Sequence, residues 1–256
     1  MGTRDRELAG AESGFLETAD IETSSDEYAR RFDGRVGRWF LDVQERATLA
    51  MLRPYPGATV LDVGGGHGQL TPALVRAGHK VMVLGSAEVC RKRVQAYVDQ
   101  GLCAFDAGDL LALPYADASF DVTVSYRLMA HVIRWKRFVS ELARVSRLAV
   151  ILDYPSVRSL NYAAPLLFGV KRRYEETVRP FTCFREADLL DELRLQGFEP
   201  GARFPQYFFP MLLHRMLRVQ PLSAAAERIC RAVGLTERFG SPVILRVRRT
   251  MASQGE

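Results

Sequence analysis

The residues with the clearest chemical use are the glycines of segment 60–68, which reads Val-Leu-Asp-Val-Gly-Gly-Gly-His-Gly. A β-rich run passes through Asp62 into this turn, and an amphipathic stretch begins at Gln69. Glycine is needed where the backbone takes a positive φ or must approach a ligand without a Cβ in the way. The helix N-terminus beyond such a turn presents unpaired N–H groups. The segment therefore predicts a strand–turn–helix unit that binds a cofactor.

The spacing of the glycines separates two cofactor classes. A dinucleotide-binding turn has the pattern G-x-G-x-x-G, whose last position here is Gln69 or Thr71, depending on the register. That mismatch, and the absence of a Tyr-x-x-x-Lys pair, disfavour a nicotinamide-dependent oxidoreductase, which stays as an alternative. The pattern D-x-G-x-G-x-G is satisfied in full by Asp62, Gly64, Gly66 and Gly68.

Further motifs follow the glycine turn. Gly-Asp-Leu at 108–110 precedes Leu-Pro-Tyr at 113–115, and Ser-Phe-Asp-Val stands at 119–122. With the glycine turn, these stretches resemble the motifs of class I S-adenosylmethionine-dependent methyltransferases. The resemblance covers about residues 58–153 and is closest to the small-molecule branch that includes quinone-biosynthesis enzymes.

The resemblance implies S-adenosyl-L-methionine as the cofactor. In that family the glycine loop wraps the methionine end, and the acidic residue before it orders the loop and the cofactor's amino group. The aspartate of the Gly-Asp-Leu stretch bonds the adenine amino group, and the end of the fourth strand lies beside the transferred methyl. The implied cofactor-binding residues are Asp62, Gly64, Gly65, Gly66, Gly68, Gly85, Ser86, Asp109, Leu110 and Tyr126.

One position departs from the family pattern. The family usually has Asp or Glu at the end of the second strand, where it binds both ribose hydroxyls, and Gly85 stands there in this chain. Ser86 or Glu88, from the next turn, are the candidates to replace it. The departure keeps open a second hypothesis, a non-catalytic member of the fold that binds the cofactor.

Methyl transfer is a direct displacement at a sulfonium carbon, so alignment supplies much of the rate enhancement. A phenol, enol or hydroxyl acceptor also needs a base, which adds a factor of about 10²–10⁴. His131 is the first candidate for this base and Tyr126 the second, although a histidine at that place is more often a packing or cofactor-side group. No carboxylate-rich cluster of the magnesium-dependent type is present, and we predict no metal.

The predicted acceptor is a small apolar or lipid-like molecule, methylated on oxygen or carbon. In the family, the N-terminal helices and the segments after the fifth and sixth strands build the acceptor pocket. Here those pieces contain many aromatic residues and some arginines, which suit an apolar molecule with a carboxylate or phosphate. Tyr28, Arg172 and Tyr207 are the candidate substrate residues.

Short apolar runs alternating with helical stretches indicate a parallel sheet covered on both faces. With two later strands near 202–208 and 242–247, the predicted fold class is α/β. We expect a Rossmann-like, seven-stranded, mostly parallel sheet with helices on both faces and an N-terminal helical extension. The five earlier strands are predicted at 58–63, 81–84, 102–105, 120–125 and 148–152.

The domain organisation follows from the same patterns. Residues 1–23 are acidic, lack apolar periodicity and predict a mobile tail; Ser24 and Glu27 then form a capping box before a helical pattern. Residues 24–250 are predicted as one methyltransferase domain. Its predicted parts are a helical cap (24–53), the cofactor-binding core (58–153) and two substrate-side insertions (154–184 and 208–240).

Composition narrows the remaining classes. The chain has 256 residues, 48% of them hydrophobic, and no run of about 18 apolar residues or apolar leader, which predicts a cytoplasmic protein. The four scattered cysteines indicate buried thiols.

The charge distribution bears on the partners of the protein. Eight acidic but only two basic residues fall within 1–27, and the basic clusters beyond are short, so no nucleic-acid partner is expected. The apolar segment 208–217 admits peripheral membrane contact. A monomer and a homodimer both fit.

Overall fold

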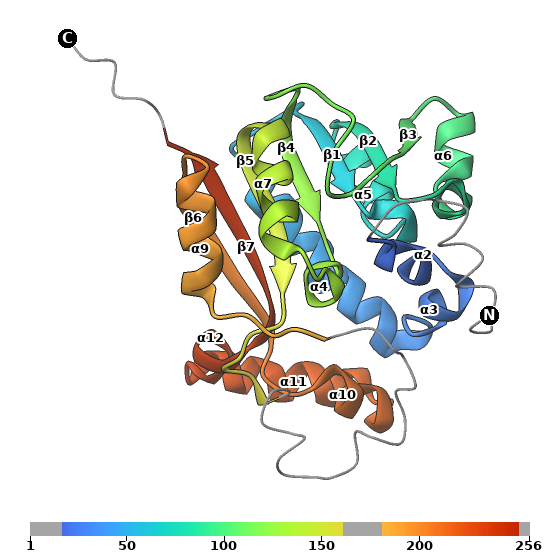
Figure 1. The fold of residues 1–256 in the computed structure, drawn as a ribbon. Coiled ribbons are helices and arrows are strands. Elements are labelled where there is room, and N and C mark those ends of the chain that lie inside the picture. The colour runs from blue at the N-terminus through green and yellow to red at the C-terminus, as the bar shows by residue number, and fades with distance from the viewer. Residues whose placement is uncertain (1–16, 161–180, 251–256) are drawn as a thin grey trace.

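A computed structural model of the chain describes residues 17–160 and 181–250 (Figure 1). Its centre is a seven-stranded sheet of order β3-β2-β1-β4-β5-β7-β6. β7 is antiparallel to both its neighbours and the other pairs are parallel, which confirms the predicted mostly parallel sheet. The strands are β1 (Thr59–Val63), β2 (Lys80–Gly85), β3 (Cys103–Ala107), β4 (Phe120–Ser125), β5 (Ser146–Tyr154), β6 (Phe198–Tyr207) and β7 (Ser241–Arg249).

Helices lie on both faces of the sheet and beyond its ends. The α-helices are α2 (Ala19–Thr23), α3 (Asp26–Arg30), α4 (Gly34–Leu52), α5 (Thr71–Arg76), α6 (Gln95–Asp99), α7 (Trp135–Val145), α9 (Glu186–Leu195), α10 (Met211–Leu217), α11 (Gln220–Ala232) and α12 (Leu235–Phe239). Short 3₁₀ helices are η1 (Gly65–His67), η2 (Glu88–Arg93) and η3 (Met129–His131). Within the described parts of the chain, no helix has the length and apolar character needed to cross a membrane.

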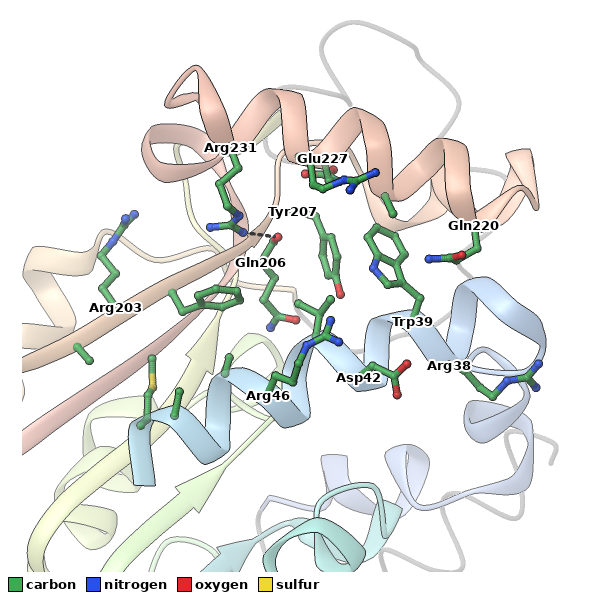
Figure 2. Close-up of a pocket in the computed structure, with 18 of the residues that line it drawn as sticks. Arg38, Trp39, Asp42, Arg46, Arg203, Gln206, Tyr207, Gln220, Glu227 and Arg231 are labelled. Carbon is green, nitrogen blue, oxygen red and sulfur yellow. Dashed lines mark hydrogen bonds between the residues drawn. The ribbon is translucent and has the colours of Figure 1, made fainter. Parts of the chain in front are cut away.

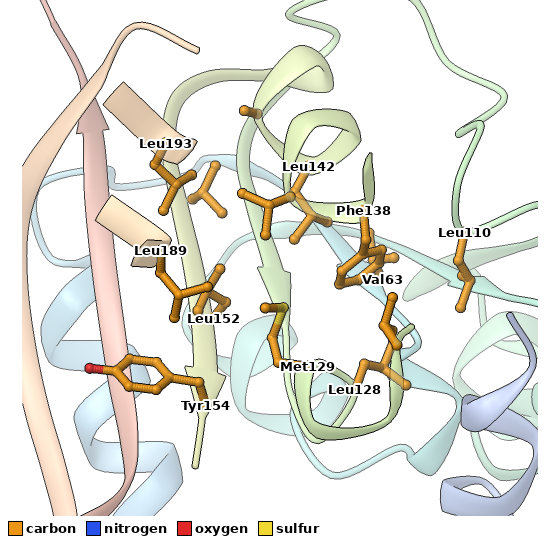
Figure 3. Packing of buried hydrophobic residues seen from close by; sticks show 14 of the residues in the cluster. Val63, Leu110, Leu128, Met129, Phe138, Leu142, Leu152, Tyr154, Leu189 and Leu193 are labelled. Carbon is orange, nitrogen blue, oxygen red and sulfur yellow. The ribbon is translucent and has the colours of Figure 1, made fainter. Parts of the chain in front are cut away.

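Alternation along the strands divides the core between the two faces, since successive side chains point to opposite sides. Val63 and Leu152 belong to the cluster that includes residues of α7 and α9, whereas their neighbours on the strands face the cluster beneath α4 and α5. Figure 3 shows Phe138 of α7 and Leu189 of α9 above the first of these faces. The buried strands are therefore apolar on both sides, as the sequence predicted.

The N-terminal segment differs from the prediction. Residues 17–23 are not part of a mobile tail: α2 is helical, and Ala19, Asp20 and Ile21 are buried. The predicted capping serine is also shifted by one position, because Ser25, not Ser24, accepts a hydrogen bond from the backbone N–H of Tyr28. Tertiary packing stabilises this five-residue helix, which is too short to be stable alone.

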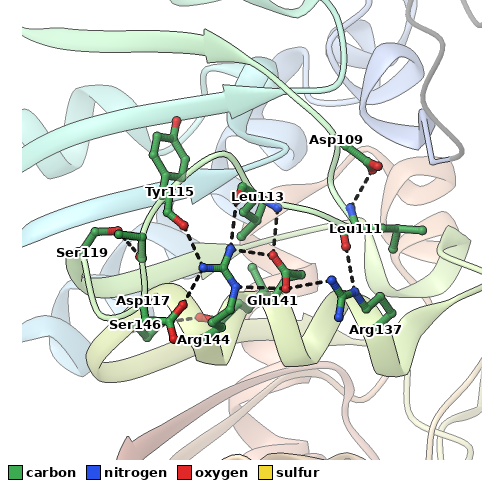
Figure 4. Close-up of polar contacts among 12 residues, drawn as sticks. Asp109, Leu111, Leu113, Tyr115, Asp117, Ser119, Arg137, Glu141, Arg144 and Ser146 are labelled. Atoms are coloured by element: carbon green, nitrogen blue, oxygen red, sulfur yellow. Dashed lines mark hydrogen bonds and ion pairs between the residues drawn. The ribbon is translucent and has the colours of Figure 1, made fainter.

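The loop between β3 and β4 is attached to α7 by a buried ion pair (Figure 4). Glu141 is 2% exposed and accepts hydrogen bonds from the Leu113 N–H at 2.9 Å and from Arg144 Nη2 at 2.7 Å. Arg144 also donates to the carbonyl oxygens of Tyr115 and Leu113. Burial alone would raise the pKa of Glu141, but the bonds from Arg144 and Leu113 lower it on balance. The pair thus fixes the position of the loop that carries Asp109.

We expect Glu141→Ala to lower the free energy of unfolding by about 3 kcal/mol, because it leaves the buried Leu113 N–H and Arg144 without their shared acceptor. Urea denaturation at pH 7 measures the change. Because the folded pKa is lowered, the contribution of Glu141 is complete above about pH 4.3 and disappears as the pH falls through the folded value. The control is Asp117→Ala, which removes an exposed partner of the same arginine and is expected to cost under about 1 kcal/mol. Equal losses of unfolding free energy in both variants would contradict the role given to Glu141.

Candidate functional site

The glycine turn follows β1 in a conformation that only glycine adopts easily. Gly64 and Gly68 have φ values of +74° and +66°. A Cβ on Gly64 would lie 2.2 Å from Cδ1 of Leu128, and one on Gly66 would lie 2.6 Å from the carbonyl oxygen of Cys90. The turn is therefore a cradle of bare backbone at the carboxyl end of the sheet.

Asp62 lies directly beneath this cradle. Its side chain is fully buried, and neither carboxylate oxygen has a hydrogen-bond partner. A Cβ on Gly65 would lie 2.2 Å from Cγ of Asp62, so the backbone of the turn rests on the carboxyl group. Burial raises the pKa of Asp62 to about 7. An unpaired buried carboxyl group at a glycine turn is what a site for a ligand amino group requires.

Other polar atoms near the turn also lack partners. The Nδ1 atom of His67 accepts a hydrogen bond from the N–H of Gln69, while its Nε2 atom is buried and unpaired. Burial lowers the pKa of His67 to about 3, so this ring is neutral at physiological pH. Gln69 Oε1 and Thr71 Oγ1 are buried without partners as well. The residues present therefore fit a small polar ligand such as the methionine part of the predicted cofactor.

The predicted adenine site is formed at the start of the β3–β4 loop. Asp109 is half-buried, and its Oδ1 atom accepts a hydrogen bond from the N–H of Leu111 at 2.8 Å. Leu110 beside it is fully buried. The carboxylate stabilises the turn and keeps capacity for a further donor, since it has about four acceptor positions. This geometry allows Asp109 both to stabilise the turn and to accept a hydrogen bond from a ligand.

The end of β2 is arranged differently from the prediction. Glu88 is exposed and pairs with Arg91, so it does not replace the missing acidic residue at Gly85. Ser86 is fully buried, and its N–H and hydroxyl groups both donate to the carboxylate of Asp20. Asp20 comes from α2, which the sequence placed in the tail. The sequence signal for the burial of Asp20 is its place between Ala19 and Ile21, a small and an apolar residue.

The side chain of Tyr126, the residue after β4, is directed toward α4. Its side chain is fully buried, and its hydroxyl group is 2.8 Å from Oγ1 of Thr48 on α4. Burial is the largest cause of the raised pKa of Tyr126. The hydroxyl group thus joins the end of β4 to α4, and the role of Tyr126 as a base stays a prediction.

His131 and Tyr28 lie at the carboxyl end of the sheet. His131 ends η3, is partly exposed and packs against Phe181, with ring centroids 5.7 Å apart. Tyr28 is partly exposed on α3, and its ring centroid is 5.9 Å from the guanidinium carbon of Arg127. Both residues lie near the carboxyl ends of β4 and of β1, the strand that the glycine turn follows.

Arg127 is a residue that sequence reasoning did not select. It follows β4 with a φ of +65°, donates its N–H to Asp153 at 2.6 Å and its guanidinium to Gln44 at 2.7 Å. The guanidinium carbon also lies 4.0 Å from the ring centroid of Phe32. Burial raises the pKa of Asp153 to about 6 in spite of the Arg127 contacts. A left-handed non-glycine residue marks a functional position or local strain, but no sequence pattern reveals it.

The other two substrate candidates do not line this site. Tyr207 is 1% exposed, packs among Trp39, Phe40 and His214, and donates its hydroxyl hydrogen to the carbonyl oxygen of Phe40. The structure therefore corrects the prediction for Tyr207, whose side chain attaches β6 to α4. Arg172 lies outside the described residues.

A separate groove of about 1280 Å³ lies between α4, β6 and α11 (Figure 2). Tyr207 and Trp39 form part of its apolar lining, and the acidic residues Asp42 and Glu227 also border it. No residue of the glycine turn lines this groove. Its basic lining residues are Arg35, Arg38, Arg46, Arg53, Arg203, Arg228, Arg231 and Arg246. Among the residues that the structure describes, no group of His, Cys, Asp and Glu could hold a metal ion.

Comparison with known proteins gives three results. Residues 61–149 match a family model described as a methyltransferase domain. An O-methyltransferase of Pyrenophora dematioidea is 38% identical over 40% of this chain and 42% of its own, and a demethylmenaquinone methyltransferase of Thermobifida fusca is 32% identical over 50% and 57%. These matches thus span about half the length of the curated relatives.

A solved structure shares the fold over most of the chain. It is the magnesium protoporphyrin IX methyltransferase of Synechocystis PCC 6803 with bound S-adenosylhomocysteine, at a TM-score of 0.62 and 20% identity. The match covers 88% of this chain and 94% of that one. At this identity the likeness shows the fold alone.

We expect Asp62→Asn to stabilise the ligand-free protein at pH 8 by about 2–4 kcal/mol and to leave its stability at pH 4 nearly unchanged. The folded pKa is near 7, and an unfolded aspartate titrates near 3.9. The folded protein therefore retains a proton between these values, and its stability falls as the pH rises through them. Urea denaturation at both pH values measures the difference.

The control is Asp191→Asn, which changes an exposed carboxyl group on α9 and is expected to shift neither value by more than about 0.5 kcal/mol. A loss of stability in Asp62→Asn at pH 8 would show that the charged carboxylate holds the fold together.

Proposed function

Because the chain carries a class I S-adenosylmethionine-dependent methyltransferase domain, as its motifs predicted, we propose that it transfers a methyl group to a small apolar or lipid-like acceptor. The observation that carries this proposal is the unpaired, buried carboxyl group of Asp62 beneath the glycine cradle. It favours binding of a ligand with a cationic amino group, and S-adenosyl-L-methionine has one.

The cofactor, when bound, supplies an activated methyl group on a sulfonium sulfur. Asp62 would bind the amino group, and the bare backbone of the turn would admit the methionine part without steric conflict. Asp109 and Leu110 would hold the adenine. These residues align the cofactor relative to the end of β4, and alignment supplies much of the rate enhancement in a displacement reaction.

Proton removal from the acceptor is assigned to His131. His131 is partly exposed and ends η3, which follows β4 at its carboxyl end. The relatives named above include an O-methyltransferase and a demethylmenaquinone methyltransferase, and an acceptor oxygen or an activated ring carbon each loses a proton. Arg127 and Tyr28 lie at the same end and would contact the acceptor.

The test is formation of S-adenosylhomocysteine from S-adenosylmethionine, with a short-chain demethylmenaquinone and a catechol as acceptor probes. We expect turnover with at least one probe and a decrease of about 10²–10⁴-fold in His131→Gln, because a general base contributes this factor. Binding of S-adenosylhomocysteine, measured by calorimetry, should remain within about twofold of the wild type.

His79→Gln is the matched control, because it alters a histidine near the start of β2, at the opposite end of the strand from Ser86. Its turnover should equal that of the wild type. Absence of S-adenosylhomocysteine binding in the wild type would contradict the proposed function, and full turnover in His131→Gln would contradict only the assignment of the base.

A membrane surface is the proposed source of the acceptor. Leu212, Met216 and Val219 form one exposed stripe, and each is at least 50% exposed. Leu222 and Ile229 begin a second stripe, which Val233 continues at helical spacing. Figure 1 shows α10 and α11 beyond the carboxyl ends of β4 and β5, the end of the sheet that carries the glycine turn. Large apolar side chains that are exposed side by side indicate an interaction surface.

The charges beside these stripes favour an anionic lipid surface over other occupants. Between residues 210 and 234 the sequence has four arginines and one histidine, His214, and the single acidic residue is Glu227. Glu227 is buried and accepts hydrogen bonds from the N–H groups of Phe208 and Phe209. Arg218 and Arg228 are exposed, and each arginine near an anionic surface contributes about 1 kcal/mol. A lipid-like acceptor would then reach the site from the bilayer.

We expect the protein to sediment with vesicles of phosphatidylglycerol and phosphatidylcholine, and much less with phosphatidylcholine alone. Replacing Met216, Leu222 and Ile229 together by glutamine should weaken vesicle binding by about tenfold or more, since three large apolar side chains no longer enter the lipid. Leu195→Gln on α9 is the control, because that leucine is 79% exposed but lies off this surface. A concentration-dependent dimer that the triple variant abolishes, without vesicle binding, would assign the surface to a second copy of the chain.

A further inference from the structure

A carboxylate from α2 stands at the carboxyl end of β2, next to the first residue after the strand. Oδ2 of Asp20 accepts a hydrogen bond from the Ser86 N–H at 2.6 Å, and Oδ1 accepts one from the Ser86 hydroxyl at 2.5 Å. The thiol of Cys90 donates to Oδ2 at 3.4 Å. Asp20 is 0% exposed. A carboxylate buried this deeply is costly, so its place at this edge requires an explanation.

Gly85 cannot carry a carboxylate at this edge. A Cβ on Gly85 would lie 2.6 Å from Cβ of Cys90 and 3.1 Å from Cζ of Phe105. In Rossmann-type sheets an acidic residue at the end of the second strand accepts hydrogen bonds from the ribose hydroxyls of the bound nucleotide. Any carboxylate at this position of the present chain must therefore come from another segment.

Asp20 is not needed merely to attach α2. Glu17 already anchors the segment, because one of its carboxylate oxygens accepts hydrogen bonds from the N–H groups of Ile133 and Arg134. Ala19 and Ile21 are buried in the two main hydrophobic clusters on opposite faces of the sheet. These contacts fix the short helix without the carboxylate of Asp20.

The carboxylate of Asp20 also keeps acceptor capacity. It receives three hydrogen bonds from Ser86 and Cys90, and a carboxylate has about four acceptor positions. Burial raises the pKa of Asp20 in spite of these donors, so the protein alone does not satisfy the charged form. α2 packs on η1, which places Asp20 at the edge shared by the glycine turn and β2.

We propose that Asp20 supplies, from α2, the carboxylate that binds the ribose hydroxyls of S-adenosylmethionine in place of the acidic residue that Gly85 excludes. The inference rests on the proposed function. It makes the N-terminal helix a part of the cofactor site. The hydroxyl of Ser86, bonded to Asp20, positions that carboxylate.

The experiment measures calorimetric binding of S-adenosylhomocysteine and of its 2′-deoxy analogue to the full-length wild type, Asp20→Asn and Glu17→Gln. The wild type should bind the parent ligand about tenfold more tightly than the analogue, since a hydrogen bond to a charged acceptor is lost. Asp20→Asn should bind the parent ligand about tenfold more weakly and discriminate between the two ligands by less than about threefold. Glu17→Gln should match the wild type in both respects.

Comparison of two ligands on the same variant separates ribose recognition from any loss of folding. Wild-type discrimination retained in Asp20→Asn would overturn the assignment while leaving the proposed function intact. Tighter binding by Asp20→Asn would also overturn it and would show that Asp20 competes with the ligand for Ser86. Failure of the wild type to bind S-adenosylhomocysteine would overturn both proposals. Equal weakening by Glu17→Gln would reduce Asp20 to an anchor of α2.

Discussion

The contact between the Asp62 carboxyl group and the backbone of the glycine turn is the constraint on which the site depends. A side chain at Gly65 would collide with this carboxyl group, and one at Gly64 would collide with Leu128. These two positions of the turn must therefore be glycine, because Leu128 and the Asp62 carboxyl group occupy the space that a Cβ would need. This arrangement leaves a buried carboxyl group unpaired, which lowers the stability of the ligand-free protein and favours a cationic ligand.

Two contacts between charged groups hold the elements around this turn in place. The Glu141–Arg144 pair holds the loop with Asp109 against α7. Arg127 connects the ends of β4 and β5 to α4 through Asp153 and Gln44. Both connections are made by charged groups that are largely removed from water, so each is stronger and more dependent on exact pairing than a surface ion pair.

Two further features lie outside the central part of the chain, one in its N-terminal part and one in its C-terminal part. α2 covers the edge of the sheet beside the glycine turn and brings Asp20 to the end of β2. α10 and α11 carry exposed apolar stripes with arginines beside them, and several of these arginines also line the groove between α4 and α11. The motifs in the middle of the chain are thus combined with peripheral elements that would set cofactor binding and acceptor access.

The sequence by itself determined the class of fold and the position of the cofactor turn. Local signals suffice there: glycine spacing, the acidic residue before the turn, and the alternation of short apolar runs with helical stretches depend on neighbours in the chain. These signals correctly predicted the seven-stranded, mostly parallel sheet.

Only the tertiary structure decided which side chains meet. Tyr126 turns to Thr48 and Tyr207 to Phe40, because burying a large aromatic ring and satisfying its hydroxyl group depend on partners more than 70 residues away. Asp20 is separated from Ser86 by 66 residues. No periodicity shows that an acidic residue in an apparently unstructured, acidic segment will be buried, since its helix is stabilised by packing on the sheet and not by its own sequence.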